Sequence, residues 1–303
     1  MPAIVYSLAP AKLNSTVVPV ERVGFSPGVI ANPHQHSGNE YPTLVAIPGA
    51  TPRITLTIPF RAAYDVLGLG ISALTGFEVY LAKFGSLTRL ATSTHTKWAL
   101  TTDCTAAAII TGASVNQDGL LMAEVEVYPL SNNGTTHPLT RTDNNAMPTL
   151  SAQPTLHTSG PLSINGTVIP GVASYGIDLG QRLEVQRTDG ALYPLLAVRV
   201  DAAPKLTATH ADPVTMINAL GSLLGANISS NVVAYFRQLA TSGITDTGAT
   251  AVSITVASGR VLPLEVTSAQ GQVATMGLEV HGLSSSATHP FAMSVSATAP
   301  AIP

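Results

Sequence analysis

Two histidines separated by one residue, His34 and His36, are the densest cluster of potential metal ligands in the chain. At this spacing both side chains would lie on one side of a strand, where imidazole nitrogens can bind a transition metal. Glu40 is the only carboxylate nearby, and no cysteine, aspartate or third histidine is close enough to complete a tetrahedral site. The flanking segments Asn32-Pro33 and Ser37-Gly38-Asn39 are typical of a loop tip. We therefore interpret the pair as part of a loop and predict no metal site.

Candidate nucleophiles and catalytic acids are also few. The single cysteine, Cys104, follows Asp103, whose carboxylate disfavours a reactive thiolate, so we expect a buried structural residue. Glu124 and Glu126 would share one face of a strand and could form a carboxylate pair, but a solvated face or a subunit contact is the simpler interpretation. No G-x-S-x-G elbow, H-E-x-x-H helix or P-loop occurs. The sequence thus predicts no catalytic residue, no cofactor and no enzymatic activity.

Charged residues are scarce in this chain. Its 303 residues include 14 Lys+Arg and 17 Asp+Glu, giving 10% charged residues and a net charge of −3, whereas an average soluble domain has roughly 25%. The hydrophobic content of 45% can fill a core, which argues against intrinsic disorder. No apolar run is long enough to span a membrane, and no basic run favours sequence-specific DNA binding. A surface with so few charges favours burial against other subunits.

The chain matches itself at an offset of about 152 residues. Residues 41–55 read YPTLVAIPGATPRIT, and residues 193–207 read YPLLAVRVDAAPKLT. Four further blocks match in the same order: LNSTVVP at 13–19 with INGTVIP at 164–170, AKF at 82–84 with AYF at 234–236, Glu126-Val127 and Leu130-Ser131 with Glu279-Val280 and Leu283-Ser284, and THP at 136–138 with THP at 288–290. Collinear matches along the whole chain predict a tandem duplication, with a boundary in the Pro/Ser/Thr-rich stretch 147–160.

The duplication predicts two domains of ordinary size, residues 1–150 and residues 151–303. Alternating apolar and polar residues predict strands in both, and Gly, Pro, Asn and Asp recur at the spacing of turns. The clearest strand patterns are residues 54–58, 125–127 and 252–256. Residues 188–190, Thr-Asp-Gly, predict a hairpin turn between residues 183–185 and 193–200.

One short helix is expected in each half. In the first half, residues 61–67 can form two turns before Gly68. In the second half, Asp212 is the predicted N-cap, and a helix is predicted over residues 214–224 up to Gly225. The predicted fold class is therefore mainly β, with two tandem homologous β-sandwich or barrel domains, each carrying one short α-helix.

His137 and His289 occupy matching positions of the repeat, each directly before a proline. A catalytic residue is usually needed once, so its recurrence in both copies favours a structural role. We interpret both as turn histidines whose rings form hydrogen bonds to the local backbone.

Over its whole length the chain resembles the major tail tube proteins of long-tailed bacteriophages. The resemblance rests on the duplication, the β-rich pattern, the small number of charges and the lack of a catalytic motif. The resemblance implies small β-domains with one flanking helix, six of which close a ring, so that three two-domain chains form a pseudo-sixfold ring. It implies that rings stack into a hollow tube in the virion, through which DNA passes non-specifically, with other tail proteins at the tube ends. It also implies synthesis in the bacterial host cytoplasm, in agreement with an amino terminus that lacks the features of a signal peptide.

Under this resemblance, two polar loops that precede the Tyr-Pro landmark, residues 24–39 and 176–190, are the predicted contacts between rings. The residues predicted to make them are Pro27, Asn32, His34, His36, Asn39, Arg182, Arg187 and Asp189. Within a ring, strand edges would pair across subunits, which covers exposed edges. Few charges are expected in such a subunit, since a buried charge is costly unless it is paired.

Three other functions fit part of the pattern. A capsid or capsid-decorating protein would share the low charge and the β-rich fold, but would assemble on a closed lattice. A receptor- or carbohydrate-binding β-module would show clustered exposed aromatic residues, and only 5% of this chain is aromatic, with one tryptophan. A hydrolase would need a catalytic constellation that the motif search does not find.

Overall fold

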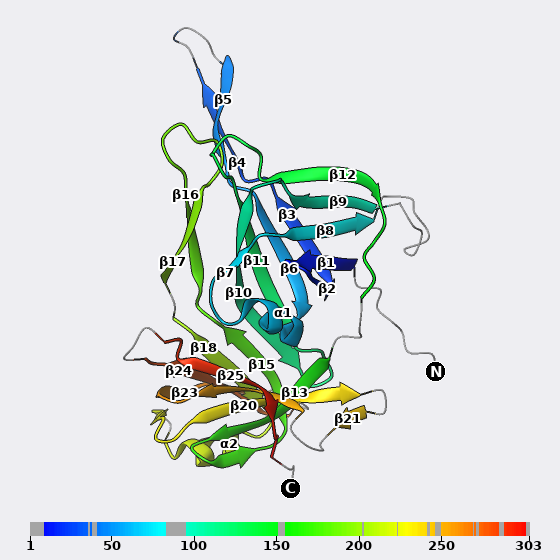
Figure 1. Ribbon diagram of the computed structural model, residues 1–303. Coiled ribbons are helices and arrows are strands. Elements are labelled where there is room, and N and C mark those ends of the chain that lie inside the picture. The colour runs from blue at the N-terminus through cyan, green and yellow to red at the C-terminus, as the bar shows by residue number, and fades with distance from the viewer. Residues whose placement is uncertain are drawn as a thin grey trace.

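The protein is mainly β in the computed structural model (Figure 1). The structure describes residues 9–35, 37, 41–82, 95–150, 155–201, 203–222, 224–240, 243–245, 250–268, 270, 273–284 and 288–300. Within these ranges, no helix has the length and apolar character needed to cross a membrane. The predicted fold class is confirmed in its main feature, a chain built from antiparallel strands with two helices among the described residues.

The described part of the first half contains twelve strands and one helix. They are β1 (Ala9–Leu13), β2 (Thr16–Val20), β3 (Arg22–Ser26), β4 (Val29–His34), β5 (Leu44–Ala50), β6 (Arg53–Pro59), α1 (Phe60–Leu67), β7 (Ser72–Leu74), β8 (Phe77–Ala82), β9 (His95–Leu100), β10 (Thr105–Asn116), β11 (Met122–Leu130) and β12 (Leu139–Asn145).

Among the described residues, the second half follows the same order of elements and adds the short strand β21, whose matching positions in the first half lie outside the described residues. Its elements are β13 (Leu156–Ile164), β14 (Thr167–Ile169), β15 (Val172–Asp178), β16 (Arg182–Gln186), β17 (Leu196–Asp201), β18 (Lys205–His210), α2 (Pro213–Leu220), β19 (Ala226–Asn227), β20 (Val232–Ala240), β21 (Gly243–Thr245), β22 (Ala251–Val256), β23 (Gly259–Thr267), β24 (Thr275–Gly282) and β25 (Phe291–Ala297).

Strand pairing also follows one scheme in both halves. One sheet has the order β2-β1-β8-β9-β12 in the first half and β14-β13-β20-β22-β25 in the second. The other has the order β7-β10-β11-β6-β3 in the first half and β19-β23-β24-β18-β15 in the second. A separate hairpin completes each half, β4–β5 and β16–β17. Each strand thus has the same neighbours within its own half as its counterpart has.

The two halves share one sheet. The carboxyl-terminal part of β10 pairs antiparallel with β15, from Gly112 opposite Asp178 to Asn116 opposite Ser174. This pairing joins the β3-containing sheet of the first half to the β15-containing sheet of the second, and the result is one ten-stranded sheet. In Figure 1 this sheet runs from the first half at the top into the second half below.

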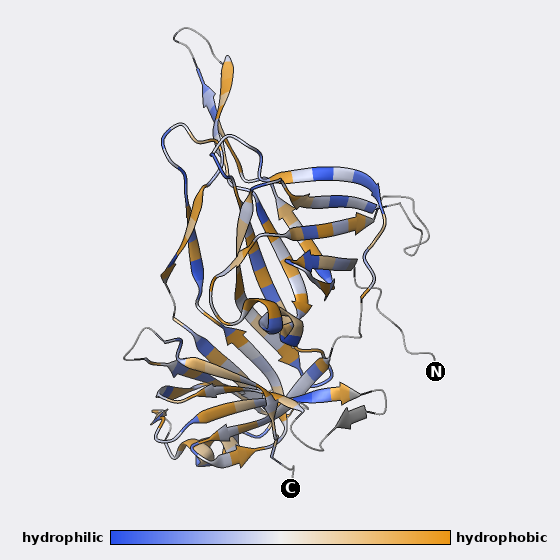
Figure 2. Cartoon of the chain, in the orientation of Figure 1, coloured by the Kyte–Doolittle hydropathy of each residue, from blue (hydrophilic) through white to orange (hydrophobic). Residues whose placement is uncertain are grey.

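Alternation of residue types explains which face of the shared sheet is buried. In β6, Ile54, Leu56 and Ile58 are buried, whereas Arg53 and Thr55 lie on the opposite, more exposed face. Figure 2 shows this alternation of hydrophobic and hydrophilic residues along the strands. The buried side chains of both halves form one continuous hydrophobic cluster. Polar residues are therefore gathered on the other face of the ten-stranded sheet.

The helices differ in how they begin. α1 starts without a side-chain cap and buries Phe60 completely, whereas Asp212 caps α2 by accepting hydrogen bonds from the backbone nitrogens of Val214 (3.0 Å) and Thr215 (3.4 Å). The predicted end of α1 at Gly68 is confirmed, but α2 ends at Leu220, not at residue 224. Gly221 has φ +69°, a left-handed conformation that ends the helix early.

The predicted loops 24–39 and 176–190 are largely strands. Residues 29–34 and 44–50 form the β4–β5 hairpin, which projects beyond the rest of the molecule (Figure 1), and the second segment contributes β16 to the β16–β17 hairpin. The turn predicted at 188–190 is present, but β17 begins at Leu196, three residues after Tyr193. Their Pro, Gly and Asn content suggested loops, although projecting two-stranded hairpins can also carry these residues.

Candidate functional site

No arrangement typical of a catalytic or metal centre occurs among the described residues. His34 is the exposed last residue of β4, and His36 lies outside the described residues. No group of three His, Cys, Asp or Glu side chains that could hold a metal ion is found in the described ranges. Cys104 is buried with 4% of its surface exposed, as predicted.

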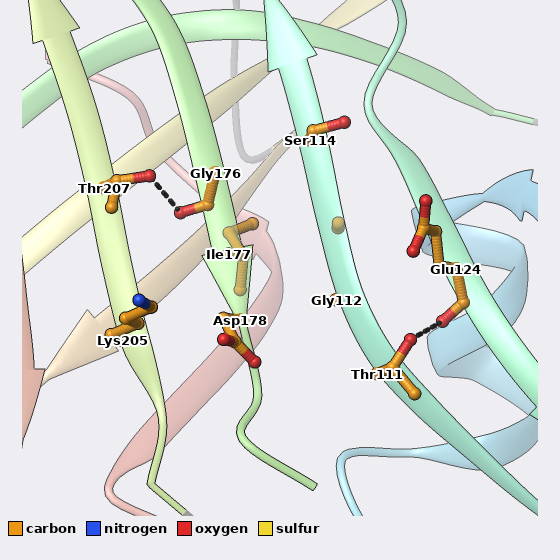
Figure 3. A pocket seen from close by; sticks show the side chains of 10 residues that line it. Thr111, Gly112, Ser114, Glu124, Gly176, Ile177, Asp178, Lys205 and Thr207 are labelled. Atoms are coloured by element: carbon orange, nitrogen blue, oxygen red, sulfur yellow. Dashed lines mark hydrogen bonds between the residues drawn. The ribbon is translucent and has the colours of Figure 1, made fainter.

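A hollow of about 410 Å³ lies on the polar face of the ten-stranded sheet, where the halves meet (Figure 3). Adjacent strands β11, β10, β15 and β18 form it, and its charged lining residues are Glu124, Asp178 and Lys205. The Thr111 hydroxyl donates to the Glu124 carbonyl oxygen at 3.2 Å, and the Thr207 hydroxyl donates to a β15 carbonyl oxygen at 3.2 Å. Both hydroxyls are therefore held by backbone acceptors, and neither is hydrogen-bonded to a side chain that could act as a general base.

Glu126 in the first half and Glu279 in the second occupy matching positions on this polar face. Glu126 forms an ion pair with Arg53 and accepts a hydrogen bond from the Tyr128 hydroxyl at 2.7 Å. Burial and this hydrogen bond raise the pKa of Tyr128 to about 12. Glu279 contacts the Nε2 atom of His281 at 2.6 Å. Glu126 and Glu279 thus both have partners within the sheet. Glu124 is exposed on the same polar strand face, in agreement with the solvated face that the sequence favours, and it lines the hollow.

The junction between β10 and β15 depends on a close backbone approach. A side chain at Gly112 would place its Cβ 2.7 Å from the carbonyl oxygen of Ile177, a distance that Cβ atoms do not tolerate. Two more backbone hydrogen bonds continue the junction beyond the paired residues, from the Leu179 nitrogen to the Thr111 oxygen at 3.0 Å and from the Gln117 nitrogen to the Ala173 oxygen at 2.8 Å. The two halves are thus held by strand pairing as regular as that within either half.

Two strand edges that match the joined edges of β10 and β15 lack a strand partner in the described part of the same sheet. Among the described residues, β3 pairs only with β6, and residues 264–267 of β23 pair only with β24. At the junction, Ile177 and Ala113 face each other with 3% and 6% of their surfaces exposed. Their counterparts, Phe25 on the open edge of β3 and Val266 on the open edge of β23, are 39% and 48% exposed. The chain therefore carries two uncovered edges equivalent to the two that cover each other.

The β16–β17 hairpin makes a second contact between the halves. The Arg187 guanidinium donates to the Pro48 carbonyl oxygen at 3.2 Å, and Gly49 leaves the room that the Arg187 side chain occupies. The backbone nitrogen of Ala50 donates to the Leu192 oxygen at 2.8 Å. The tip of the second-half hairpin thus rests on the base of the first-half hairpin.

The residues predicted to form contact loops lie at or near these two hairpins. Pro27 separates β3 from β4, and Asn32 and His34 are exposed on β4. Arg182 begins β16, Arg187 follows it, and Asp189 is in the hairpin turn. Asn39, like His36, lies outside the described residues. Of the described ones, Arg187 is joined to the other half by the hydrogen bond given above.

The predicted role of the two turn histidines is confirmed. The Nδ1 atom of His137 lies 3.1 Å from the Leu139 nitrogen and 2.6 Å from its oxygen. His289 makes the matching contacts with Phe291, at 3.1 and 3.2 Å. Burial is the main cause of a lowered pKa of His289.

No protein-family model matches the chain, and no curated protein matches it. Its function has to be inferred from the geometry described above.

Sequence reasoning did not find the open edges or the partner of the Tyr-Pro landmark. The Tyr193 ring packs edge-to-face against the His137 ring, with 5.0 Å between the ring centroids. The matched blocks located the two residues separately, but they are 56 residues apart and in different halves, and no pattern within either block predicts that they meet. The signal available was the recurrence itself, because both members of that contact belong to repeated blocks.

Proposed function

We propose that this protein is a structural virion protein that assembles head to tail with copies of itself into rings, and that stacked rings form a phage tail tube. The observation that carries the proposal is the β10–β15 junction together with its two open counterparts, β3 and β23. Pairing β23 of one copy with β3 of the next would give a contact between chains that resembles the internal β10–β15 contact, with the backbones further apart where Glu265 takes the place of Gly112. A head-to-tail contact of this kind forms a closed ring when the rotation that relates neighbouring copies divides a full turn evenly.

We interpret the chain as a tandem duplication of one β-sandwich unit. The support is the common order of elements, the common strand neighbours and details such as the left-handed Asn14 and Asn165. The Asn14 side-chain oxygen accepts from the Thr75 nitrogen at 3.0 Å, and that of Asn165 accepts from the Ser229 nitrogen at 2.9 Å. In the first half, α1 contacts both β2 and β6, which belong to the two different sheets. Three chains would then give a ring with six similar units.

The exposed surface agrees with a subunit rather than a compact monomer. The chain exposes 15942 Å², whereas a folded monomer of this mass exposes about 12,000 Å². Few charged residues would need to be buried when copies associate, since only 10% of the chain is charged. Burying the edges also removes unpaired backbone groups that invite unspecific pairing.

In this proposal the polar face of the ten-stranded sheet lines the lumen. Among the described residues, strand register places both acidic and basic residues on it: Glu124, Glu126, Asp178 and Glu279 with Arg22, Arg53, Lys205 and Arg260, and Glu265 at the position that matches Gly112. A near-neutral wall attracts the phosphate backbone weakly, because counterion release needs a net basic surface. The hollow at the junction supplies a concave lining. DNA could then pass without binding tightly.

The test is electron microscopy and sedimentation of the purified protein over a range of concentrations. Wild-type protein is expected to form hollow rings or tubes. Phe25→Asp and Val266→Asp are each expected to remain monomeric, because the new carboxylate would be buried at the contact, whereas Val214→Asp, on a more exposed residue of α2, is expected to assemble. Because Phe25 stacks on Trp98 within the chain, circular dichroism of Phe25→Asp has to show an unchanged fold.

Mixing the two blocked variants makes the test specific. Each retains one intact edge, so an equimolar mixture of Phe25→Asp and Val266→Asp is expected to form dimers that grow no further. A wild-type protein that stays monomeric at all concentrations and salt conditions would contradict the proposal. Closed shells in place of tubes would favour the capsid alternative.

A further inference from the structure

At one cross-strand position, the contact between the two halves has a carboxylate on one strand and no side chain on the other. Gly112 of β10 lies opposite Asp178 of β15, and Asp178 in turn lies opposite Lys205 of β18 (Figure 3). A Cβ at Gly112 would lie 2.7 Å from the Ile177 carbonyl oxygen, so the two strands can approach this closely only at a glycine. The internal contact therefore contains one carboxylate and one basic residue at this position.

At the two open edges, the carboxylate is on the opposite strand. The register of β23 puts Glu265 in the place of Gly112. The register of β3 puts Ser26 in the place of Asp178 and opposite the basic residue Arg53 of β6. Glu265, Ser26 and Arg53 are all exposed. A contact between β23 of one copy and β3 of another would therefore also contain one carboxylate and one basic residue.

This arrangement bears on which edges can pair with each other. In a chain of two similar halves, β23 of one copy could pair with β15 of another copy before β10 covers it, and such exchanges are a characteristic misassembly of repeat proteins. Glu265 would then lie opposite Asp178, and like charges directly opposite each other are destabilising. Opposite Ser26, the same carboxylate would meet a hydroxyl that can donate a hydrogen bond. Arg53, on the strand behind Ser26, adds a positive charge whose side chain is 44% exposed beside Glu126.

We propose that Glu265 selects the strand edge with which β23 pairs, so that β23 joins β3 of a second copy and not β15. This inference rests on the proposed head-to-tail assembly and names the residues that make it specific. The side chain of Glu265 also keeps the backbones of β23 and β3 further apart than those of β10 and β15. At this position the outer contact is therefore made by side chains, whose charge can distinguish one partner edge from another.

Ser26→Asp tests the selection, because it gives the β3 edge the carboxylate of the β15 edge. The new carboxylate would lie opposite Glu265 and is expected to raise the concentration at which assembly begins about fivefold, equivalent to about 1 kcal/mol per contact. Ser26→Asn, which has nearly the same shape and no charge, is the matched control and is expected to assemble like wild type. Sedimentation velocity measures this concentration. Circular dichroism is expected to show an unchanged fold, since Ser26 is exposed.

A second substitution in the same chain tests whether Glu265 is the group that the new carboxylate meets. Ser26→Asp combined with Glu265→Gly gives the outer edges the residues of the inner contact, an aspartate opposite a glycine. This double variant is expected to begin assembly at the wild-type concentration or below it. For Ser26→Asp alone, salt at about 1 M, where the Debye length is about 3 Å, is expected to reduce the fivefold penalty, because the penalty is electrostatic.

The outcomes separate this inference from the proposed function. If wild-type protein does not assemble, both are overturned. If wild type assembles and Ser26→Asp begins to assemble at the same concentration as Ser26→Asn, head-to-tail assembly stands and selection by Glu265 is overturned. If Ser26→Asp impairs assembly and Glu265→Gly does not relieve the defect, the new carboxylate is disfavoured by another group, and selection by Glu265 is again overturned.

Discussion

The two halves of the chain have the same strand neighbours but differ where they touch each other. Ile177 and Ala113 are buried in the contact between β15 and β10, whereas Phe25 and Val266, at the matching positions, are exposed. Tyr193 packs against His137, whereas Tyr41 is 72% exposed. At these matching positions, burial thus depends more on whether the other half of the chain covers the position than on the type of residue. The comparison teaches that burial at matching positions differs according to whether the other half of the chain covers them, and in the proposed assembly a second copy covers the exposed ones.

The largest expected difference in stability between the two halves concerns the first residues of their helices. Phe60 is fully buried at the start of α1, and Asp212 takes the matching position before α2 as an exposed cap. Phe60→Ala is expected to lower the free energy of unfolding by about 3–5 kcal/mol, because it empties a core position. Asp212→Ala is expected to cost much less, since it removes only a cap at the surface. Urea unfolding measures both, and equal losses would show that the helices are held in the same way.

The shared sheet gives a second, smaller expected effect. Gly112→Val is expected to destabilise the monomer by about 1–3 kcal/mol, because a side chain there overpacks against the Ile177 carbonyl oxygen. The matching position in β23 is Glu265, exposed on the open edge. Glu265→Gly is therefore the control and is expected to leave monomer stability nearly unchanged. Unfolding at a concentration below assembly measures both, and an unchanged Gly112→Val variant would contradict the close approach.

Acid is expected to act more weakly and mainly on the second half. Burial is the main cause of the lowered pKa values of His157 and His289, both in the second half. Below about pH 6.5, the ordinary pKa of histidine, the unfolded chain takes up protons that the folded chain does not. The stability that these two neutral histidines contribute to the folded state is therefore present above this pH and is lost as the pH falls.

Hydrogen exchange at pH 7.5 and pH 5.5 measures where this loss occurs. After correction for intrinsic exchange rates, amides of β13–β25 are expected to lose more protection than those of β1–β12. Equal loss in both halves would mean that histidine burial does not direct the acid response.

Strands β6, β11, β16, β17 and β22 could be predicted from the sequence, but of the strand pairings only the β16–β17 hairpin could. Alternation identified β6, β11 and β22 because each has one face on the core. The same criterion missed the β4–β5 hairpin, whose residues are exposed on both faces. The early end of α2 follows from the left-handed conformation of Gly221, which precedes a more obvious stop at Gly225. The junction of β10 with β15 is a long-range pairing that no local pattern encodes.

The proposed fusion of two units in one chain has a consequence for the polar face. Separate identical subunits would repeat every charge six times around the proposed ring, whereas fused units are free to diverge. Where the first half has Arg22 and Glu124, the second has Ser174 and Gly277 at the matching register positions. The wall of the proposed tube would therefore place its charges at different points in the two halves, giving its electrostatic potential threefold periodicity on a backbone with nearly sixfold symmetry.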